Sequence, residues 1–238
     1  MRILCAGDGA IILELGADAS FSISRRVFRV FRELQSASPP GFIAALPTLR
    51  SVTVQFDPQV TDHEAIATYL LALVEDKPES PGRPSSWWRI PVCYDGELAP
   101  DLAIIAARVG ISSDALAELH TQQRYRVYMV GGFPGFAFMG DLPPLLQAPR
   151  LASPRTAVPA GSVAIAGRMT AIYPAATPGG WNLIGRTPLR LFNADWQTPA
   201  PIGPGDEVEF SSISKVEFEN LACGVCGGEV SVADFRVR

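Results

Sequence analysis

Hydrophobic positions recur with two different periods in the first third of the chain. Four apolar residues spaced three or four positions apart predict an amphipathic helix over Ser22–Gln35. Short apolar or alternating runs predict strands at Ala10–Leu15, Phe42–Leu46 and Ser51–Phe56. The helix also carries Arg25, Arg26, Arg29 and Arg32. Surface charge is the norm on a helix that packs on a core, so we interpret these arginines as a solvated face rather than an anion-binding patch.

The following segments extend this order of elements. Thr61 and Glu64 have the spacing of a capping box, which predicts the start of a second helix. After a stretch rich in proline, glycine and serine at Lys77–Ser86, the run Trp88–Cys93 predicts a further strand. The order is then β-α-β-β-α-β, which is typical of the ferredoxin-like fold. We therefore predict an N-terminal ferredoxin-like α/β domain over residues 1–90.

A second domain is predicted over residues 91–238. Pro100–Val109 and Ser112–His120 have the pattern of two short helices. From Arg124 onward the hydrophobic period changes to two, which predicts strands. Twelve of the 21 prolines lie between residues 131 and 205, among alternating segments such as Ser162–Ala166. This combination indicates β structure with stiff turns rather than a disordered linker.

Composition narrows the classes of function. The chain has 238 residues, and 47% are hydrophobic, enough for a sizeable core. A net charge of -4 without runs of like charge argues against nucleic acid or an anionic membrane as a partner. No window reaches 18 uninterrupted apolar residues, and Asp8 and Glu14 interrupt the start, where a secretory signal needs an uncharged stretch. We predict a cytoplasmic protein.

Cysteine and lysine usage argue against a metal site and a P-loop. The four cysteines are too scattered for a disulfide scaffold, and Cys223 and Cys226 form the only CxxC pair, so we expect reduced thiols and no metal. The only lysines are Lys77 and Lys215, and neither belongs to a phosphate-binding P-loop. Any phosphate or carboxylate must therefore be held by arginine or by backbone N–H groups.

The candidate chemistry lies in turn-rich segments after Arg124. Gly131–Phe136 would expose backbone N–H groups beside two aromatic rings, which suits a flat amide but also an ordinary turn. Pro159–Ser162 is a rigid turn that offers a hydroxyl. Arg155 and Arg186 could each hold an anion by bidentate pairing, or form surface ion pairs.

His120 is the remaining candidate. Its unperturbed pKa near neutrality suits a general acid or base, whereas its place at the end of a helix suits capping of carbonyls. No Ser-His-Asp order, HExxH element or Gly-x-Ser-x-Gly elbow is present in the sequence. The residues alone thus predict a two-domain α/β protein with a β site lined by arginine and glycine.

Many of these residues also belong to motifs that resemble a known family. The motifs are Gly7–Ala10, Asp57–Pro58, Tyr94–Gly96, Tyr125–Tyr128, Gly132–Phe136, Pro154–Thr156, Val158–Val163, Ile172–Pro174 and Pro178–Pro188. They resemble the family that comprises KipI and the B subunit of 5-oxoprolinase, also called allophanate hydrolase subunit 1 or the first half of a carboxyltransferase domain. The likeness covers nearly the whole chain.

The resemblance implies an α+β fold in which a small N-terminal domain precedes a C-terminal cyclophilin-like β-barrel. It implies the B subunit of an ATP-dependent 5-oxoprolinase, inactive or nearly so alone, which acts with a homologous C subunit and a LamB/YcsF-like A subunit to open 5-oxo-L-proline to L-glutamate. ATP with Mg²⁺ is expected in that complex. Two alternatives stay open: a KipI-type inhibitor of a sensor histidine kinase, and half of a biotin-dependent carboxyltransferase or allophanate hydrolase acting on a urea-like amide.

Within that resemblance, a site in the barrel would hold a small amide substrate. The expected catalytic residues are His120, Arg155 and Arg186. The expected substrate-binding residues are Phe133, Pro134, Gly135, Phe136, Gly161, Ser162, Met169, Thr170, Trp181 and Thr187. Two departures stand out: Met169 replaces a glutamine that the family commonly has, and Ser211–Arg238 runs past the family's usual end.

Overall fold

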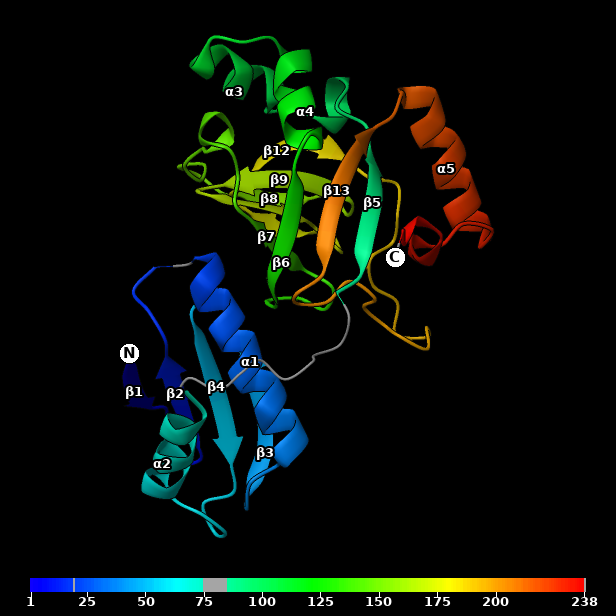
Figure 1. Cartoon of the computed structure of the whole chain (residues 1–238). Helices are drawn as coiled ribbons and strands as arrows, with labels where there is room; N and C mark the ends of the chain where they lie inside the picture. The colour runs from blue at the N-terminus through cyan, green and yellow to red at the C-terminus, as the bar shows by residue number, and fades with distance from the viewer. Residues whose placement is uncertain (19, 75–84, 238) are drawn as a thin grey trace. The chain divides into compact units, whose positions relative to one another are not determined.

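The computed structural model describes residues 1–18, 20–74 and 85–237. The chain divides into two compact units, Met1–Pro84 and Ser85–Arg238, each with its own sheet and hydrophobic core (Figure 1). Within the described ranges, no helix is long and apolar enough to cross a bilayer.

The first unit is a four-stranded antiparallel sheet with two helices packed on it. Its elements are β1 (Arg2–Cys5), β2 (Ala10–Glu14), α1 (Phe21–Ala37), β3 (Phe42–Pro47), β4 (Ser51–Phe56) and α2 (His63–Val74). The strands lie in the order β1-β2-β4-β3, so β4 lies between the two strands that α1 connects. Alternate residues of β4, namely Val52, Val54 and Phe56, are buried against the helices, as their period of two predicts.

The predicted strand at Trp88–Cys93 does not complete this sheet. Instead β1, a strand too short and too exposed to show in the hydrophobic pattern, takes the edge beside β2. The strand β5 (Trp87–Val92) pairs with a strand of the other unit. The predicted β-α-β-β-α-β order is therefore wrong in its last member, and the ferredoxin-like assignment of this unit stays a prediction.

Two local predictions for the first unit are also wrong. The N-cap of α2 is Asp62 rather than Thr61, because its Oδ1 accepts from the N–H of Ala65 at 2.8 Å. Arg29 does not lie on a solvated face: it is 6% exposed, and its Nη2 donates to the carbonyl of Val74 at 3.0 Å. The packing of α2 against α1 buries this arginine and gives it backbone partners.

The second unit is built on a seven-stranded sheet that curls into a nearly closed barrel. Its strands are β5, β6 (Arg124–Val130), β7 (Ala137–Gly140), β9 (Ser162–Ala166), β10 (Met169–Ile172), β12 (Asn182–Arg186) and β13 (Glu207–Ser212). They lie in the order β12-β9-β10-β7-β6-β13-β5, and only β13 and β5 run parallel. Cys93, just after β5, exchanges two backbone hydrogen bonds with Arg186 of β12. This bridge joins the two edges of the sheet.

Helices and a small two-stranded sheet complete this unit. This small sheet pairs β8 (Arg155–Val158) antiparallel with β11 (Thr177–Gly179), and β9 and β10 lie between them in the chain. The helices are α3 (Leu102–Val109), α4 (Ser113–Thr121), α5 (Lys215–Gly227) and the short η1 (Gly96–Leu98), η2 (Pro144–Leu146) and η3 (Val232–Phe235). The predicted helices at residues 100–109 and 112–120 are both present, the first ended by Gly110 in the left-handed region and the second capped by Ser112.

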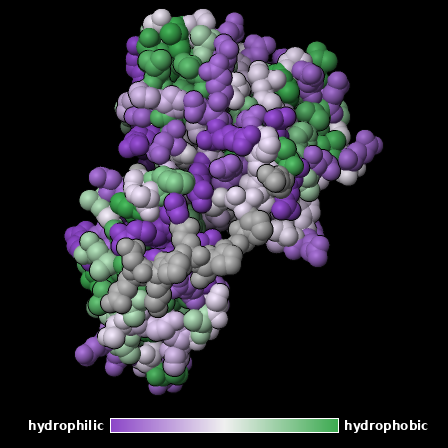
Figure 2. Space-filling model, in the orientation of Figure 1, coloured by the Kyte–Doolittle hydropathy of each residue, from purple (hydrophilic) through white to green (hydrophobic). Residues whose placement is uncertain are grey.

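Side chains on the two faces of the barrel sheet form separate clusters. In β10, for example, Ile172 belongs to the main core inside the barrel, whereas Ala171 belongs to a smaller cluster on the outer face. Hydrophobic residues also reach the surface over α3 and along α5 in the view of Figure 2, where Ile104 and Val216 are exposed. The period-two pattern that predicted strands after Arg124 is thus divided between an inner and an outer cluster.

Candidate functional site

The turn before β9 is held by a glycine at its tip. Gly161 has φ +80°, its N–H donates to the carbonyl of Tyr173 at 2.8 Å, and its own carbonyl accepts from the N–H of Thr187 at 2.9 Å. A Cβ here would lie 2.2 Å from the carbonyl oxygen of Thr187, so only glycine fits between these segments. The predicted residues Gly161 and Thr187 therefore lie side by side.

Arg186, the last residue of β12, lies next to the same turn. Its Nε donates to the carbonyl of Ala160 at 3.0 Å, and its backbone pairs with Ser162, which is buried in the β9–β12 ladder. Gly161, Arg186 and Thr187 all line one cavity of about 350 Å³. Three of the predicted site residues thus share a space large enough for a small molecule.

Arg155 lies in a different environment. Its Nη2 is 2.7 Å from Oδ1 of Asp101, whose side chain is 7% exposed. The other oxygen of that carboxylate accepts from the N–H of Leu183 at 2.6 Å. The guanidinium of Arg155 thus already has a buried counter-charge, which no motif in the sequence singled out. Its role as an anion ligand stays a prediction.

The predicted aromatic loop contributes mainly to the outer cluster of the barrel. Phe136 is buried, and its ring centroid lies 6.5 Å from that of Trp181. Pro134 and Gly135 form the turn, with Gly135 at φ +76°. Phe133 is 44% exposed. Of the two phenylalanines in the loop, Phe133 is the exposed one and Phe136 is buried.

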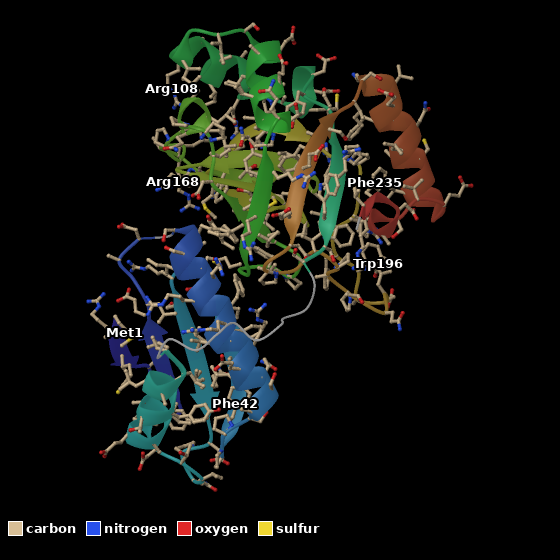
Figure 3. The ribbon with its side chains drawn as sticks, in the orientation of Figure 1. Met1, Phe42, Arg108, Arg168, Trp196 and Phe235 are labelled. Atoms are coloured by element: carbon tan, nitrogen blue, oxygen red, sulfur yellow. The ribbon has the colours of Figure 1, made fainter. Side chains whose placement is uncertain are left out.

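Met169 lies on the same outer face. It is half-buried, packs against the outer cluster with its sulfur near Gly140, and does not line the 350 Å³ cavity. Its neighbour Arg168, labelled in Figure 3, pairs with Asp141 at 3.2 Å. The departure at Met169 therefore changes the outer face, and its predicted contact with a substrate stays a prediction.

His120 lies inside the barrel and is fully buried. The hydroxyl of Tyr94 is 2.7 Å from its Nδ1, and Oγ1 of Thr170 is 3.0 Å from its Nε2. Because the Thr170 hydroxyl donates to the carbonyl of Ala164 at 3.3 Å, it accepts from a protonated Nε2, which leaves Nδ1 to accept from Tyr94. The imidazole also stacks on Phe210 with a centroid distance of 4.4 Å. Every polar atom of the neutral ring thus has a partner.

Burial sets the protonation of this group. It lowers the pKa of His120 to about 3 and raises the pKa of Tyr94 well above its ordinary value. Both side chains are therefore neutral near pH 7. Tyr94 also lines a surface hollow of about 340 Å³ together with Asp95, Asp114 and Glu118. The chain of hydrogen bonds from Tyr94 to Thr170 thus ends beneath an acidic hollow.

The predicted site residues are divided among these environments. The cavity at Gly161 holds Arg186 and Thr187, the outer cluster holds Phe136, Met169 and Trp181, and the barrel interior holds His120 and Thr170. Sequence reasoning missed Asp101 and Arg190. Asp101 could have been noticed as an acidic residue before a helix, but Arg190, which lines the same cavity as Arg186, has no local signal.

The comparisons with known proteins agree on one family. A family model described as the carboxyltransferase domain, subdomain C and D, matches residues 1–202. The chain belongs to this family. The 5-oxoprolinase B subunit of Escherichia coli O157:H7 is 39% identical to this carboxyltransferase-domain protein over 210 residues, which are 88% of this chain and 94% of that protein. The protein of the same name from Bacillus subtilis strain 168 is 36% identical over 222 residues, 89% and 92% of the two chains.

One longer protein shares the fold, and a more distant one is similar in sequence. The crystal structure of TTHA0988 superposes on the carboxyltransferase-domain protein with a TM-score of 0.76 at 36% identity, and covers 87% of this chain. The present chain spans 40% of that longer chain. Urea amidolyase of Saccharomyces cerevisiae is 25% identical over 249 residues, which are 91% of this chain and 13% of that protein.

Proposed function

We propose that this protein is the B subunit of a 5-oxoprolinase complex. One observation carries the proposal: two proteins named as the B subunit of 5-oxoprolinase align with this chain at 39% and 36% identity along nearly the full length of both partners. The reaction expected of that complex opens the lactam of 5-oxo-L-proline with water to give L-glutamate, while ATP is hydrolysed to ADP and phosphate. A homologous C subunit and an A subunit complete it.

The geometry supports a role for the cavity at Gly161 in holding an anionic substrate. The substrate of this reaction carries a carboxylate, and guanidinium groups bind carboxylates with two parallel hydrogen bonds. Arg186 is fixed there by its Nε bond to Ala160, which reduces the conformational freedom lost on binding. The barrel that carries this cavity would be of the cyclophilin-like type that the resemblance implies.

Neither lysine offers a free phosphate ligand for ATP with Mg²⁺ within the described residues. Of the two lysines, Lys77 lies outside the described residues and Lys215 pairs with Glu97 at 3.5 Å. In the part of the chain that the structure describes, no three or more His, Cys, Asp or Glu side chains gather to hold a metal ion. We therefore assign no step to the nucleotide on this chain and propose that it binds in the assembled complex.

The test is reconstitution. Phosphate release and glutamate formation are measured for this chain, for the A and C subunits together, and for the mixture of all three. Turnover that depends on 5-oxo-L-proline is expected only in the mixture, because the described chain offers no complete set of nucleophile, base and phosphate-binding groups. Robust turnover by the isolated chain, or none by the mixture, contradicts the proposal.

The match to urea amidolyase favours one second candidate, half of a carboxyltransferase that acts on a urea-like amide. That candidate is weaker, because identity is 25% and the aligned region is 13% of the amidolyase. It predicts carboxyl transfer from carboxybiotin to urea in the reconstituted complex and no response to 5-oxo-L-proline. The alternative of a kinase inhibitor stays a prediction.

A further inference from the structure

The cavity at Gly161 lies between the turn that contains Gly161, the segment after β12, and α5. The wall formed by α5 lies outside the residues that the family model matches. The lining of the cavity includes Gly161, Arg186, Arg190, Phe218, Ala222 and Val225. The last three belong to α5, beyond the residues 1–202 that the family model matches. We call this space the α5 pocket.

Two arginines and no carboxylate line the α5 pocket. Arg186 uses its Nε on the carbonyl of Ala160. Within the described residues, neither its terminal nitrogens nor the guanidinium of Arg190 has an acidic partner. Two like charges around one small space repel each other, and an anion placed between them removes that repulsion. The pocket therefore has the electrostatics of an anion site.

The opposite wall of the α5 pocket is apolar. Phe218, Ala222 and Val225 are spaced four and three positions apart, so they share one face of α5. None of them is fully buried, although α5 lies against the barrel. The helix thus presents this apolar face to the cavity, and Val225 at its end also packs against the main core. A ligand that fills the pocket would cover this face.

Contacts at both ends of α5 stabilise the helix beside the pocket. At the start of the helix, Ser214 and Glu217 form a capping box. At its end, Val225 packs against the main core, and Val232 beyond the helix is buried in it. A ligand would then bind without first ordering the helix, which favours affinity.

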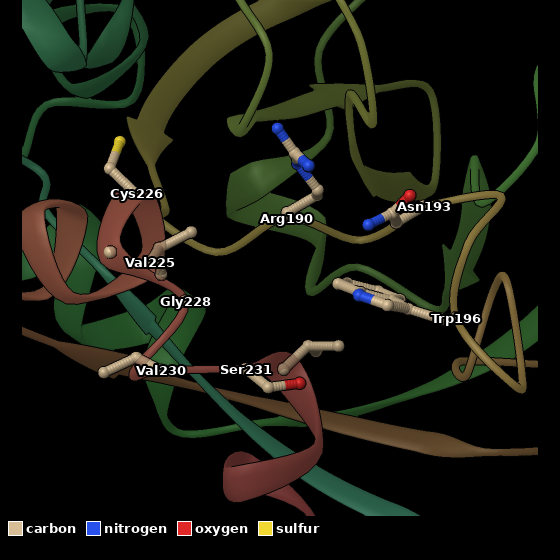
Figure 4. A pocket seen from close by; sticks show the side chains of 10 residues that line it. Arg190, Asn193, Trp196, Val225, Cys226, Gly228, Val230 and Ser231 are labelled. Atoms are coloured by element: carbon tan, nitrogen blue, oxygen red, sulfur yellow. The ribbon is translucent and has the colours of Figure 1, made fainter.

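A second hollow of about 300 Å³ adjoins the α5 pocket, since Arg190 and Val225 line both. Figure 4 shows Arg190, Asn193 and Trp196 on one side of it and Cys226 with the C-terminal segment on the other. Arg190 therefore lies between two hollows. In this position its side chain can reorient to bind a ligand.

We propose that the α5 pocket binds a small organic carboxylate with a compact apolar body. The carboxylate lies between Arg186 and Arg190, and the body lies against Phe218 and Ala222. The choice of 5-oxo-L-proline as this ligand rests on the proposed function. The site makes Arg190, which belongs to none of the sequence motifs, and the inner face of α5, which lies beyond the family match, determinants of specificity.

The experiment is a calorimetric titration of the full chain with three probes: 5-oxo-L-proline, 2-pyrrolidinone, which is the same ring without the carboxylate, and inorganic phosphate. Only 5-oxo-L-proline is expected to bind well, because it alone offers both the charge and the ring. Equal binding of phosphate overturns the apolar half of the proposal, and equal binding of 2-pyrrolidinone overturns the anionic half. No binding of 5-oxo-L-proline overturns it entirely.

Variants locate the site. Arg190→Gln should weaken binding of 5-oxo-L-proline about tenfold or more by removing one of two charges, and Ala222→Trp should block the pocket by filling it. Arg26→Gln removes an exposed arginine of α1 and serves as the charge-matched control that leaves binding unchanged. Because Arg190 is exposed, its variant should fold normally, which melting curves check. Wild-type affinity in both pocket variants overturns the location.

Reconstitution separates this proposal from the proposed function. If the variants lose binding while the complex shows no turnover that depends on 5-oxo-L-proline, the site stands and the 5-oxoprolinase assignment fails. If the complex turns over and both pocket variants retain wild-type kcat/KM, the assignment stands and the α5 pocket is not the substrate site.

Discussion

Arg155 and Arg186 belong to similar short motifs, Pro-Arg-Thr and Gly-Arg-Thr-Pro, yet their surroundings differ in charge. Arg155 meets the buried carboxylate of Asp101 at 2.7 Å. Arg186 meets a backbone carbonyl and a second arginine across a cavity. The comparison teaches that the local motif does not decide whether an arginine is structural or free to bind a ligand. A carboxylate 54 residues away in the sequence decides it.

The largest expected effect on stability comes from removing Arg155, the arginine that is paired with a buried carboxylate. Arg155→Ala leaves the buried Asp101 without its counter-charge, which should lower the free energy of unfolding by about 3 kcal/mol. Arg186→Ala removes a hydrogen bond at a partly exposed site and should cost less than about 1 kcal/mol. Urea unfolding of both variants measures the difference. Equal losses would show that the two environments are not distinct.

The glycine that shapes the pocket gives the next largest effect. Gly161→Ala adds a methyl group where the carbonyl oxygen of Thr187 lies 2.2 Å away, and it forces φ +80° on a residue with a side chain. We expect a loss of about 2–3 kcal/mol, of which about 1 kcal/mol is backbone strain. Gly132→Ala is the matched control, since its φ is also +80° but nothing lies within 4 Å of the added atom. Identical losses in the two variants would refute the clash.

His120 differs from both arginines, because its ring nitrogens have hydrogen-bond partners but the imidazole is neutral. Its pKa is about 3 in the folded protein and about 6.5 in the unfolded chain, so the unfolded state takes up the proton first as the pH falls. Below about pH 6.5 the free energy of unfolding should therefore decrease by up to about 1.4 kcal/mol per pH unit, and above about pH 7.5 this contribution should be constant.

The variant His120→Gln removes this titrating group. Subtracting its unfolding free energy from that of the wild type between about pH 4.5 and about pH 8 isolates the contribution of His120 from that of the carboxylates. The difference should shrink on the acidic side. A difference that does not vary with pH would mean that the imidazole titrates normally in the folded protein.

The smallest effect is expected at Met169. Met169→Gln restores the residue that the family commonly has, but the position is half-buried on the outer face and does not line the α5 pocket. We expect less than about 1 kcal/mol in stability and an unchanged Kd for 5-oxo-L-proline. A shift in Kd larger than about fivefold would mean that the outer face is coupled to the pocket.

Local sequence patterns predicted the helices and strands themselves better than which strands pair with one another. The helical period of α1 and the glycine that ends α3 can each be recognised within a few adjacent residues. The structure contains both the helix and the glycine cap. The sheet to which β5 belongs depends on β13, which lies far along the chain, so no local window could assign it. Arg29 is buried for a similar reason: its environment comes from α2 rather than from its own helix.

The same limit applies to the site. The positive φ of Gly161 follows from a turn motif, and its neighbour Arg186 was singled out as an anion ligand by residue type. That Asp101 neutralises Arg155, and that α5 faces Arg186 and Arg190, are facts of tertiary packing between distant segments. Sequence reasoning could name residues of the right chemistry, but it could not sort the paired ones from the unpaired ones.

The parallel pairing of β5 with β13 has a consequence for how the molecule is made. These neighbours are the first and last strands of the second unit, about 120 residues apart along the chain. During synthesis β5 leaves the ribosome long before its partner exists, so the barrel cannot close until β13 follows. The first unit needs only residues near the start and can fold earlier. A chain that ends before Glu207 would keep β5 as an open edge, and such truncated products should aggregate rather than accumulate as a smaller folded domain.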